Sequence, residues 1–139
     1  MTIPALSRNE SFARSVVSAF ATQLDPLVSQ LADIKAAVSE AVTNCIVHAY
    51  SESDKAGKIT ITAKISDDCI YIKIKDSGCG IEDIKQAMEP LFTTKADEER
   101  SGLGFAVMES CSDKVRVSSK KGKGTTVTLT FSIQKKAVI

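Results

Sequence analysis

Two runs of alternating apolar and polar residues constrain the fold of this chain more than any other feature of its sequence. They cover residues 59–65 and 70–75, and β-branched side chains recur through both. Because successive side chains of a strand point to opposite faces, a period of two predicts strands with one buried and one solvated face. The Asp67-Asp68 pair between the runs predicts a turn, so we expect an antiparallel hairpin.

The remaining regular elements lie on either side of this hairpin. Residues 114–119 and 125–133 are expected to pair as strands across the turn Gly122-Lys-Gly124. In the first third of the chain, helical spacing predicts a helix with Ser11 as its N-cap and a longer helix over residues 27–49. Helices followed by mostly antiparallel strands predict a two-layer α/β sandwich.

The middle of the chain is expected to be a long loop. Between Asp76 and Gly104 the sequence is rich in glycine, threonine and charged residues, and a short helical pattern appears only near residues 81–88. A helix is predicted again over residues 105–111. Most connections in compact domains are about 4 to 6 residues long, so a loop of this length is expected to serve a function.

Composition and charge exclude several classes of protein. The 139 residues suit a single domain, residues 1–139, and their net charge of +1 indicates no surface for nucleic-acid phosphates. No apolar run approaches the roughly 20 residues that span a bilayer, and the first residues do not resemble a signal peptide, so we expect a cytoplasmic protein with no membrane partner. The four cysteines have no C-x-x-C spacing and are expected to be reduced structural thiols. They are Cys45, Cys69, Cys79 and Cys111.

A polar stripe on the longer helix is the first candidate for chemistry. Glu40, Asn44 and His48 are spaced four residues apart, so on a helix they share one face while apolar residues cover the others. A solvated face of an amphipathic helix would have the same pattern. The single histidine, His48, is expected to be a structural partner of the helix rather than a phosphate acceptor.

Two glycine-rich segments are further candidates for a ligand site. Asp76-Ser-Gly-Cys-Gly80 directly follows a predicted strand, where glycines let the backbone approach a ligand and the carboxylate can accept a hydrogen bond. Arg100-Ser-Gly-Leu-Gly104 opens a predicted helix whose first N–H groups favour an anion. Taken alone, the first segment is equally typical of a turn that ends a strand, and the second of a helix cap.

In this order, E-A-V-T-N-C-I-V-H-A-Y, D-S-G-C-G-I and S-G-L-G-F resemble the N, G1 and G2 boxes of the GHKL ATPases. The resemblance implies a Bergerat fold, with helices on one face of a mixed, mostly antiparallel sheet, and binding of ATP or ADP with Mg²⁺. It implies Asn44 as the magnesium ligand and Asp76 as the acceptor for the adenine amino group. The nucleotide-binding residues that it implies in full are Asn44, Asp76, Gly78, Gly80, Ile81, Gly102, Leu103, Gly104, Phe105 and Thr126.

A closer resemblance extends over most of the chain. S-F-A-R, Q-L-D-P, S-E-A-V-T-N, P-L-F-T-T-K and E-R-S-G-L-G-F-A-V-M-E are similar to segments of the anti-sigma F factors of endospore-forming bacteria. This family binds a sporulation sigma factor, sigma F, as a homodimer and phosphorylates a serine of an anti-anti-sigma protein with ATP. The resemblance implies Glu40 as the general base and Arg14 as a residue that docks partners. It also implies that residues 90–101 form a lid, with Thr94, Lys95 and Arg100 near the phosphates.

The chemistry of phosphoryl transfer independently favours Glu40, because a carboxylate one helical turn from a metal ligand can orient or deprotonate a hydroxyl. Two other functions remain open. One is a nucleotide-gated clamp on a sigma factor with slow or absent turnover. The other is the catalytic module of a histidine kinase, which needs a dimerisation helix pair bearing an acceptor histidine. Pro4 falls in the expected first strand, where proline is tolerated at an edge but shortens the pairing.

Overall fold

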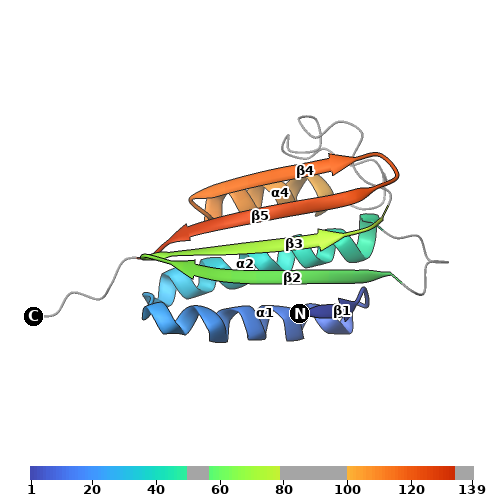
Figure 1. Cartoon of the computed structure of the whole chain (residues 1–139). Helices are drawn as coiled ribbons and strands as arrows, with labels where there is room; N and C mark the ends of the chain where they lie inside the picture. Colours follow the sequence, from blue (N-terminus) through green and yellow to red (C-terminus); the bar gives the residue numbers. More distant parts are fainter. Residues whose placement is uncertain (50–56, 79–99, 134–139) are drawn as a thin grey trace, which may run out of the picture.

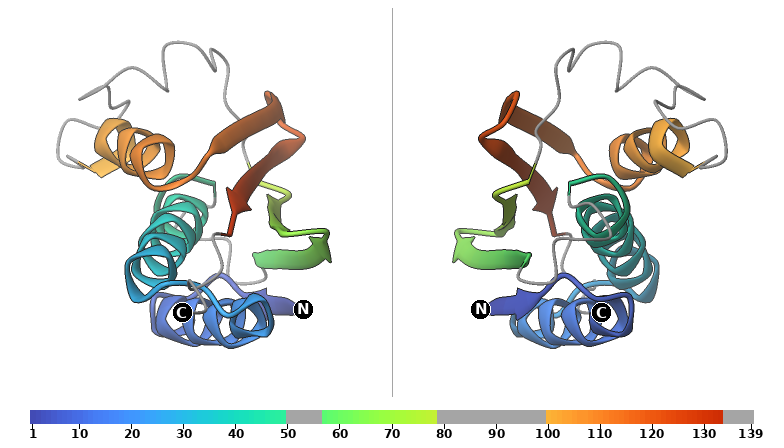
Figure 2. Two further views of the ribbon diagram at one scale, coloured as in Figure 1. Left: turned by 90° about the vertical axis from the view of Figure 1, so that its left-hand side faces the viewer. Right: turned by 90° about the vertical axis from the view of Figure 1, so that its right-hand side faces the viewer.

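A computed structural model describes residues 1–49, 57–78 and 100–133 of the chain. The strands are β1 (Thr2–Pro4), β2 (Lys58–Ser66), β3 (Cys69–Asp76), β4 (Lys114–Lys120) and β5 (Gly124–Ser132). The helices are α1 (Arg8–Ala21), α2 (Val28–Asn44) and α4 (Arg100–Cys111), with a short 3-10 turn (Thr22–Leu24) after α1 and a π-helical segment (Cys45–Ala49) after α2. Figure 1 shows β2 to β5 in front of α2 and α4, and Figure 2 shows α1, α2 and α4 on one face of the sheet. The predicted two-layer α/β sandwich is confirmed.

The described strands form one sheet in the order β1-β2-β3-β5-β4. Both predicted hairpins are present, β2 with β3 and β4 with β5. Each of the four described pairings is antiparallel, so the expectation of a mixed sheet was wrong for this part of the chain. Pro4 ends the edge strand β1 opposite Lys58, as expected for a residue that cannot donate a ladder hydrogen bond.

The alternating pattern separates the two faces of the sheet. The side chains of Ile70, Ile72 and Ile74 on β3 are completely buried toward the helices, whereas Lys73 and Lys75 between them are exposed. The other strands follow the same rule, because a period of two places alternate residues on opposite faces. The helix-covered face is therefore aliphatic, and the open face is rich in threonine and lysine.

Helix α2 packs between α1 and α4 (Figure 2). Helix α1 buries Ala13, Val17 and Ala21, which lie four residues apart and therefore on one face. It begins at Arg8 after Ser7, not after Ser11 as predicted, because apolar spacing marks the buried face and does not locate the first turn.

Helix α4 begins earlier than predicted. Its start at Arg100 places Gly102, Leu103 and Gly104 inside the helix, although glycine lowers helix propensity and the expected start was residue 105. The predicted loop and short helix over residues 79–99 lie outside the described residues. No helix in the described part of the chain is long and apolar enough to cross a membrane.

Candidate functional site

Asp76, the last residue of β3, lies at the end of the sheet where α2 finishes and where β5 and α4 begin (Figure 1). It continues the inward-facing series of β3 and is only 5% exposed. Its Oδ1 accepts hydrogen bonds from the backbone N–H groups of Gly78, at 2.9 Å, and Thr125, at 3.2 Å. A buried carboxylate is costly unless it is hydrogen-bonded, and these two donors from β5 and the turn after β3 hold it in the site.

Cys45 is the third partner of this carboxylate. The Cys45 Sγ donates to Asp76 Oδ2 at 3.4 Å, and the side chain is 4% exposed. Burial raises the pKa of the Cys45 thiol well above its ordinary value, and the Asp76 carboxylate raises it further. The thiol is therefore protonated at neutral pH and acts as a hydrogen-bond donor. Cys69 and Cys111 are free thiols, and Cys79 lies outside the described residues.

Asn44, the last residue of α2, directly precedes Cys45 and thus lies at the same end of the layer. Its Nδ2 is buried and has no hydrogen-bond partner within the described part of the protein. The Oγ of Ser39, earlier in the same helix, is likewise buried and has no partner among the described residues. An unpaired buried amide costs about 1 to 3 kcal/mol, and that cost disappears when a polar ligand supplies the partner. The carboxamide of Asn44 is therefore suited to hold a polar ligand.

Glu40 lies one turn before Asn44 on α2 and is half-buried. Burial raises the pKa of the Cys111 thiol on α4, with smaller contributions in the same direction from Asp33 and Glu40. The predicted stripe does not continue as an α-helix to His48, because the chain adopts π-helical geometry from Cys45 onward. A wider turn breaks the four-residue spacing on which that prediction depended.

Gly124, the first residue of β5, lies close against the backbone of Asp76. Its φ of +92° is a conformation that side chains rarely adopt, and a Cβ built there would lie 2.2 Å from the Asp76 carbonyl oxygen. Gly122 also has a positive φ, of +80°, as the predicted turn requires. Thr126, predicted to bind nucleotide, pairs with Lys75 and lies on the open face of the sheet. The structure therefore brings Thr125, and not Thr126, to Asp76.

The second glycine-rich segment forms the first turn of α4. The backbones of Arg100, Gly102, Leu103 and Gly104 are helical, and this turn begins at the same end of the molecule as Asp76 (Figure 1). Phe105 is 5% exposed and belongs to the hydrophobic core. The predicted site residues Gly80, Ile81, Thr94 and Lys95 lie outside the described residues, as does most of the predicted lid.

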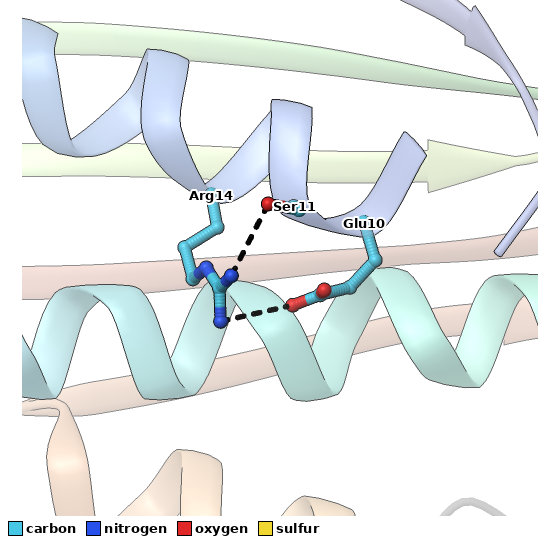
Figure 3. Close-up of polar contacts among 3 residues, drawn as sticks. All are labelled: Glu10, Ser11 and Arg14. Atoms are coloured by element: carbon cyan, nitrogen blue, oxygen red, sulfur yellow. Dashed lines mark hydrogen bonds and ion pairs between the residues drawn. The ribbon is translucent and has the colours of Figure 1, made fainter. Parts of the chain in front are cut away.

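Arg14 lies in the middle of α1. Its guanidinium donates to Ser11 Oγ at 3.3 Å and lies 3.7 Å from the Glu10 carboxylate (Figure 3). The side chain is 40% exposed, so this pair contributes little to stability and the cation is accessible.

Two contacts of Asp76 were missed by sequence reasoning. The thiol of Cys45 and the N–H of Thr125 come from positions 31 and 49 residues away in the chain. The one available signal was that Cys45 directly follows Asn44. No local pattern in the sequence indicated that Thr125, rather than Thr126, would contact Asp76.

The family described as histidine kinase-like ATPase domain matches residues 3–131. A relative from Caldanaerobacter subterraneus subsp. tengcongensis, named anti-sigma F factor, is 59% identical over 124 residues, which cover 89% of this chain and 85% of that protein. A relative of the same name from Bacillus subtilis is 49% identical over 131 residues, covering 94% of this chain and 89% of that protein.

Among solved structures, the RsbU and RsbW domains of a Mycobacterium tuberculosis protein superpose with a TM-score of 0.70. The match covers 99% of this chain and 32% of that chain, at 24% sequence identity. This likeness concerns the fold, which agrees with the two-layer arrangement described above.

Proposed function

The chain belongs to the histidine kinase-like ATPase domains and, within them, to the anti-sigma F factors, and from this premise we propose that it inhibits a sporulation sigma factor, sigma F, and phosphorylates a serine of an anti-anti-sigma protein with ATP. The observation that carries the proposal is the buried carboxylate of Asp76 at one end of a largely hydrophobic layer. A buried acceptor at this position suits an amino group on a planar heterocycle.

The donor set fits ATP with Mg²⁺. Asp76 presents carboxylate oxygens in a buried position, and the buried Nδ2 of Asn44, which has no partner among the described residues, can donate to a phosphate oxygen. A carboxamide oxygen is a hard ligand of the kind that Mg²⁺ takes, with the rest of its shell supplied by phosphates and water. When bound, the ion neutralises charge on the phosphates. Asn44 holds the ion in this proposal, and Asp76 accepts the 6-amino group of adenine.

Other residues around these two complete the nucleotide site. Gly78 and Gly80 let the backbone approach the nucleotide, with Ile81 beside them, and the first turn of α4 presents N–H groups to the phosphates through Gly102, Leu103 and Gly104. Thr94, Lys95 and Arg100 belong to a lid over the phosphates in this proposal. Phe105 follows the first turn of α4 and anchors the helix in the hydrophobic core. Thr126, on the open face, is the nucleotide-binding prediction with the weakest support.

Glu40 acts as the general base in the proposed reaction. The serine Oγ forms a bond to the γ-phosphorus, the bond from that phosphorus to the bridging oxygen breaks to release ADP, and the serine proton passes to the Glu40 carboxylate. The position of Glu40 one turn before Asn44 supports this role. The partner complexes form in the cytoplasm, with the chain as a homodimer and Arg14 on the docking surface.

The test is incubation of the chain with ATP, Mg²⁺ and the anti-anti-sigma protein, followed by mass spectrometry for phosphoserine. Glu40→Gln is the matched variant and should lower the transfer rate by about 10² to 10⁴-fold while leaving ATP affinity near that of the unmodified chain. Tight ATP binding without any phosphoserine would favour a nucleotide-gated clamp over a kinase. Transfer at the original rate in Glu40→Gln would assign the base to another group.

A further inference from the structure

The two oxygens of the Asp76 carboxylate have different environments. Among the described residues, Oδ1 accepts two backbone N–H groups, from Gly78 and Thr125, whereas Oδ2 accepts only the thiol of Cys45. A carboxylate oxygen has two lone pairs, so two donors complete Oδ1 and one donor leaves Oδ2 with an open acceptor position. Oδ2 is therefore the oxygen of Asp76 that has capacity for a ligand donor.

Cys45 determines the direction of that open position. Its Sγ lies 3.4 Å from Oδ2, in a side chain that is 4% exposed, so one lone pair is occupied by a donor that water does not reach. Cys45 also directly follows Asn44, and its hydrogen bond joins the end of α2 to the end of β3. The same contact thus connects Asp76 to the residue next to Asn44, and these are the two residues that hold adenine and magnesium in the proposed function.

We propose that Cys45 is a positioning residue that orients Asp76 Oδ2 toward the 6-amino group of adenine, so that selectivity for 6-aminopurine nucleotides depends on its S–H donor. This inference rests on the proposed function, because it takes ATP as the ligand. Cys45 itself touches neither the nucleotide nor the reacting atoms. Its effect passes through the carboxylate.

A buried cysteine also fills space as a small apolar side chain, so the test must separate orientation from packing. The probe pair is ATP and the triphosphate of purine riboside, which lacks the 6-amino group and is otherwise the same. A loss of packing would lower the affinity for both nucleotides by the same factor. A loss of orientation would lower the affinity for ATP alone.

We expect Cys45→Ala to lower ATP affinity about threefold to tenfold, as for a weak donor to a charged acceptor, with no change for the analogue. Cys45→Ser keeps a donor and should retain most of the preference for ATP. Asp76→Ala is the reference variant and should bind the two nucleotides equally. If Cys45→Ala is too unstable to purify, Cys45→Val fills the volume without a donor and takes its place.

Affinity for each nucleotide is measured by calorimetric titration with Mg²⁺ at neutral pH, at a temperature where melting curves show each variant folded. An unchanged preference for ATP in Cys45→Ala, or equal weakening of both nucleotides, overturns the inference and leaves the proposed function standing. An unmodified chain that binds ATP no better than the analogue overturns the role of Asp76, and this inference with it.

Discussion

The space between the helices and the sheet differs in chemistry along its length. In the middle, Ile34 on α2 and Ile72 on β3 are completely buried and belong to one aliphatic core. At the end where α2 and β3 finish, Asn44, Cys45 and Asp76 bring an amide, a thiol and a carboxylate into the same layer. Burial of polar groups costs free energy unless they are paired.

This difference separates what stabilises the fold from what prepares a site. The apolar side chains in the middle stabilise the folded state without any ligand. The polar end is only partly satisfied by the protein, because Asn44 Nδ2 lacks a partner within the described residues. Substitutions in the middle should therefore change stability, and substitutions at the polar end should change ligand binding.

The largest effect on stability is expected from Ile72→Ala. The side chain is completely buried, so its truncation should lower the free energy of unfolding by about 2 to 5 kcal/mol, measured by urea denaturation. Lys73→Ala is the matched control, because it is the next residue on the same strand and faces solvent. It should change stability by no more than about 0.5 kcal/mol. Similar losses in both variants would contradict the assignment of the two faces.

At the polar end, Asn44→Ala should act through the ligand. ATP with Mg²⁺ at about 100 times its dissociation constant should stabilise the unmodified chain by roughly 2.7 kcal/mol, and the variant should lose most of that gain. Without nucleotide the variant should be at least as stable as the unmodified chain, because the buried amide nitrogen has no partner to lose among the described residues and its unpaired burial is unfavourable. Thr43→Ala on the same helix is the control. Melting curves with and without ATP measure both the stability of each chain and its stabilisation by nucleotide. If ATP left the melting temperature of the unmodified chain unchanged, the proposed nucleotide site would be contradicted.

A pH effect should distinguish Cys45 from the aliphatic core. Its pKa is raised in the folded chain, so the folded state keeps the thiol proton at a pH where the unfolded state has lost it. Stability from this group is complete below the ordinary thiol pKa and falls by about 1.4 kcal/mol per pH unit above it, until the folded thiol ionises.

Cys45→Ala should therefore show a shallower loss of stability above about pH 9 than the unmodified chain. Urea denaturation at several alkaline pH values gives both slopes. Cys111 and Tyr71, whose pKa values are also raised, contribute equally to the two proteins and cancel in the comparison. Parallel slopes would mean that the Cys45 thiol ionises as readily in the folded chain as in the unfolded one.

The smallest effect on the chain itself is expected from Arg14→Ala. Its exposed ion pair with Glu10 adds little, so stability should change by less than about 0.5 kcal/mol and ATP affinity should not change. If α1 is the docking surface, both the sigma factor and the anti-anti-sigma protein should bind more weakly, as measured by titration. Arg8→Ala removes the same charge from the same helix and is the control. Undiminished binding of both partners to Arg14→Ala would place docking elsewhere.

The sequence by itself determined the parts of this protein that depend on local periodicity. Alternation identified β2 and β3 and their buried isoleucines, and helical spacing identified α2 with Glu40 and Asn44 one turn apart. These predictions succeeded because a residue's face follows from its position in a repeat of 2 or 3.6 residues. The helix starts at Arg8 and Arg100 were missed, because an end has no such repeat.

Only the tertiary structure decided which groups meet at Asp76. The carboxylate contacts Cys45 after α2 and Thr125 on β5, and β5 can approach the Asp76 backbone this closely because Gly124 has no Cβ. These partners are far apart in the chain and are brought together by the packing of α2 on the sheet and by the register of β3 with β5. No local pattern encodes them, since a contact between layers depends on how whole elements stack rather than on the spacing within one.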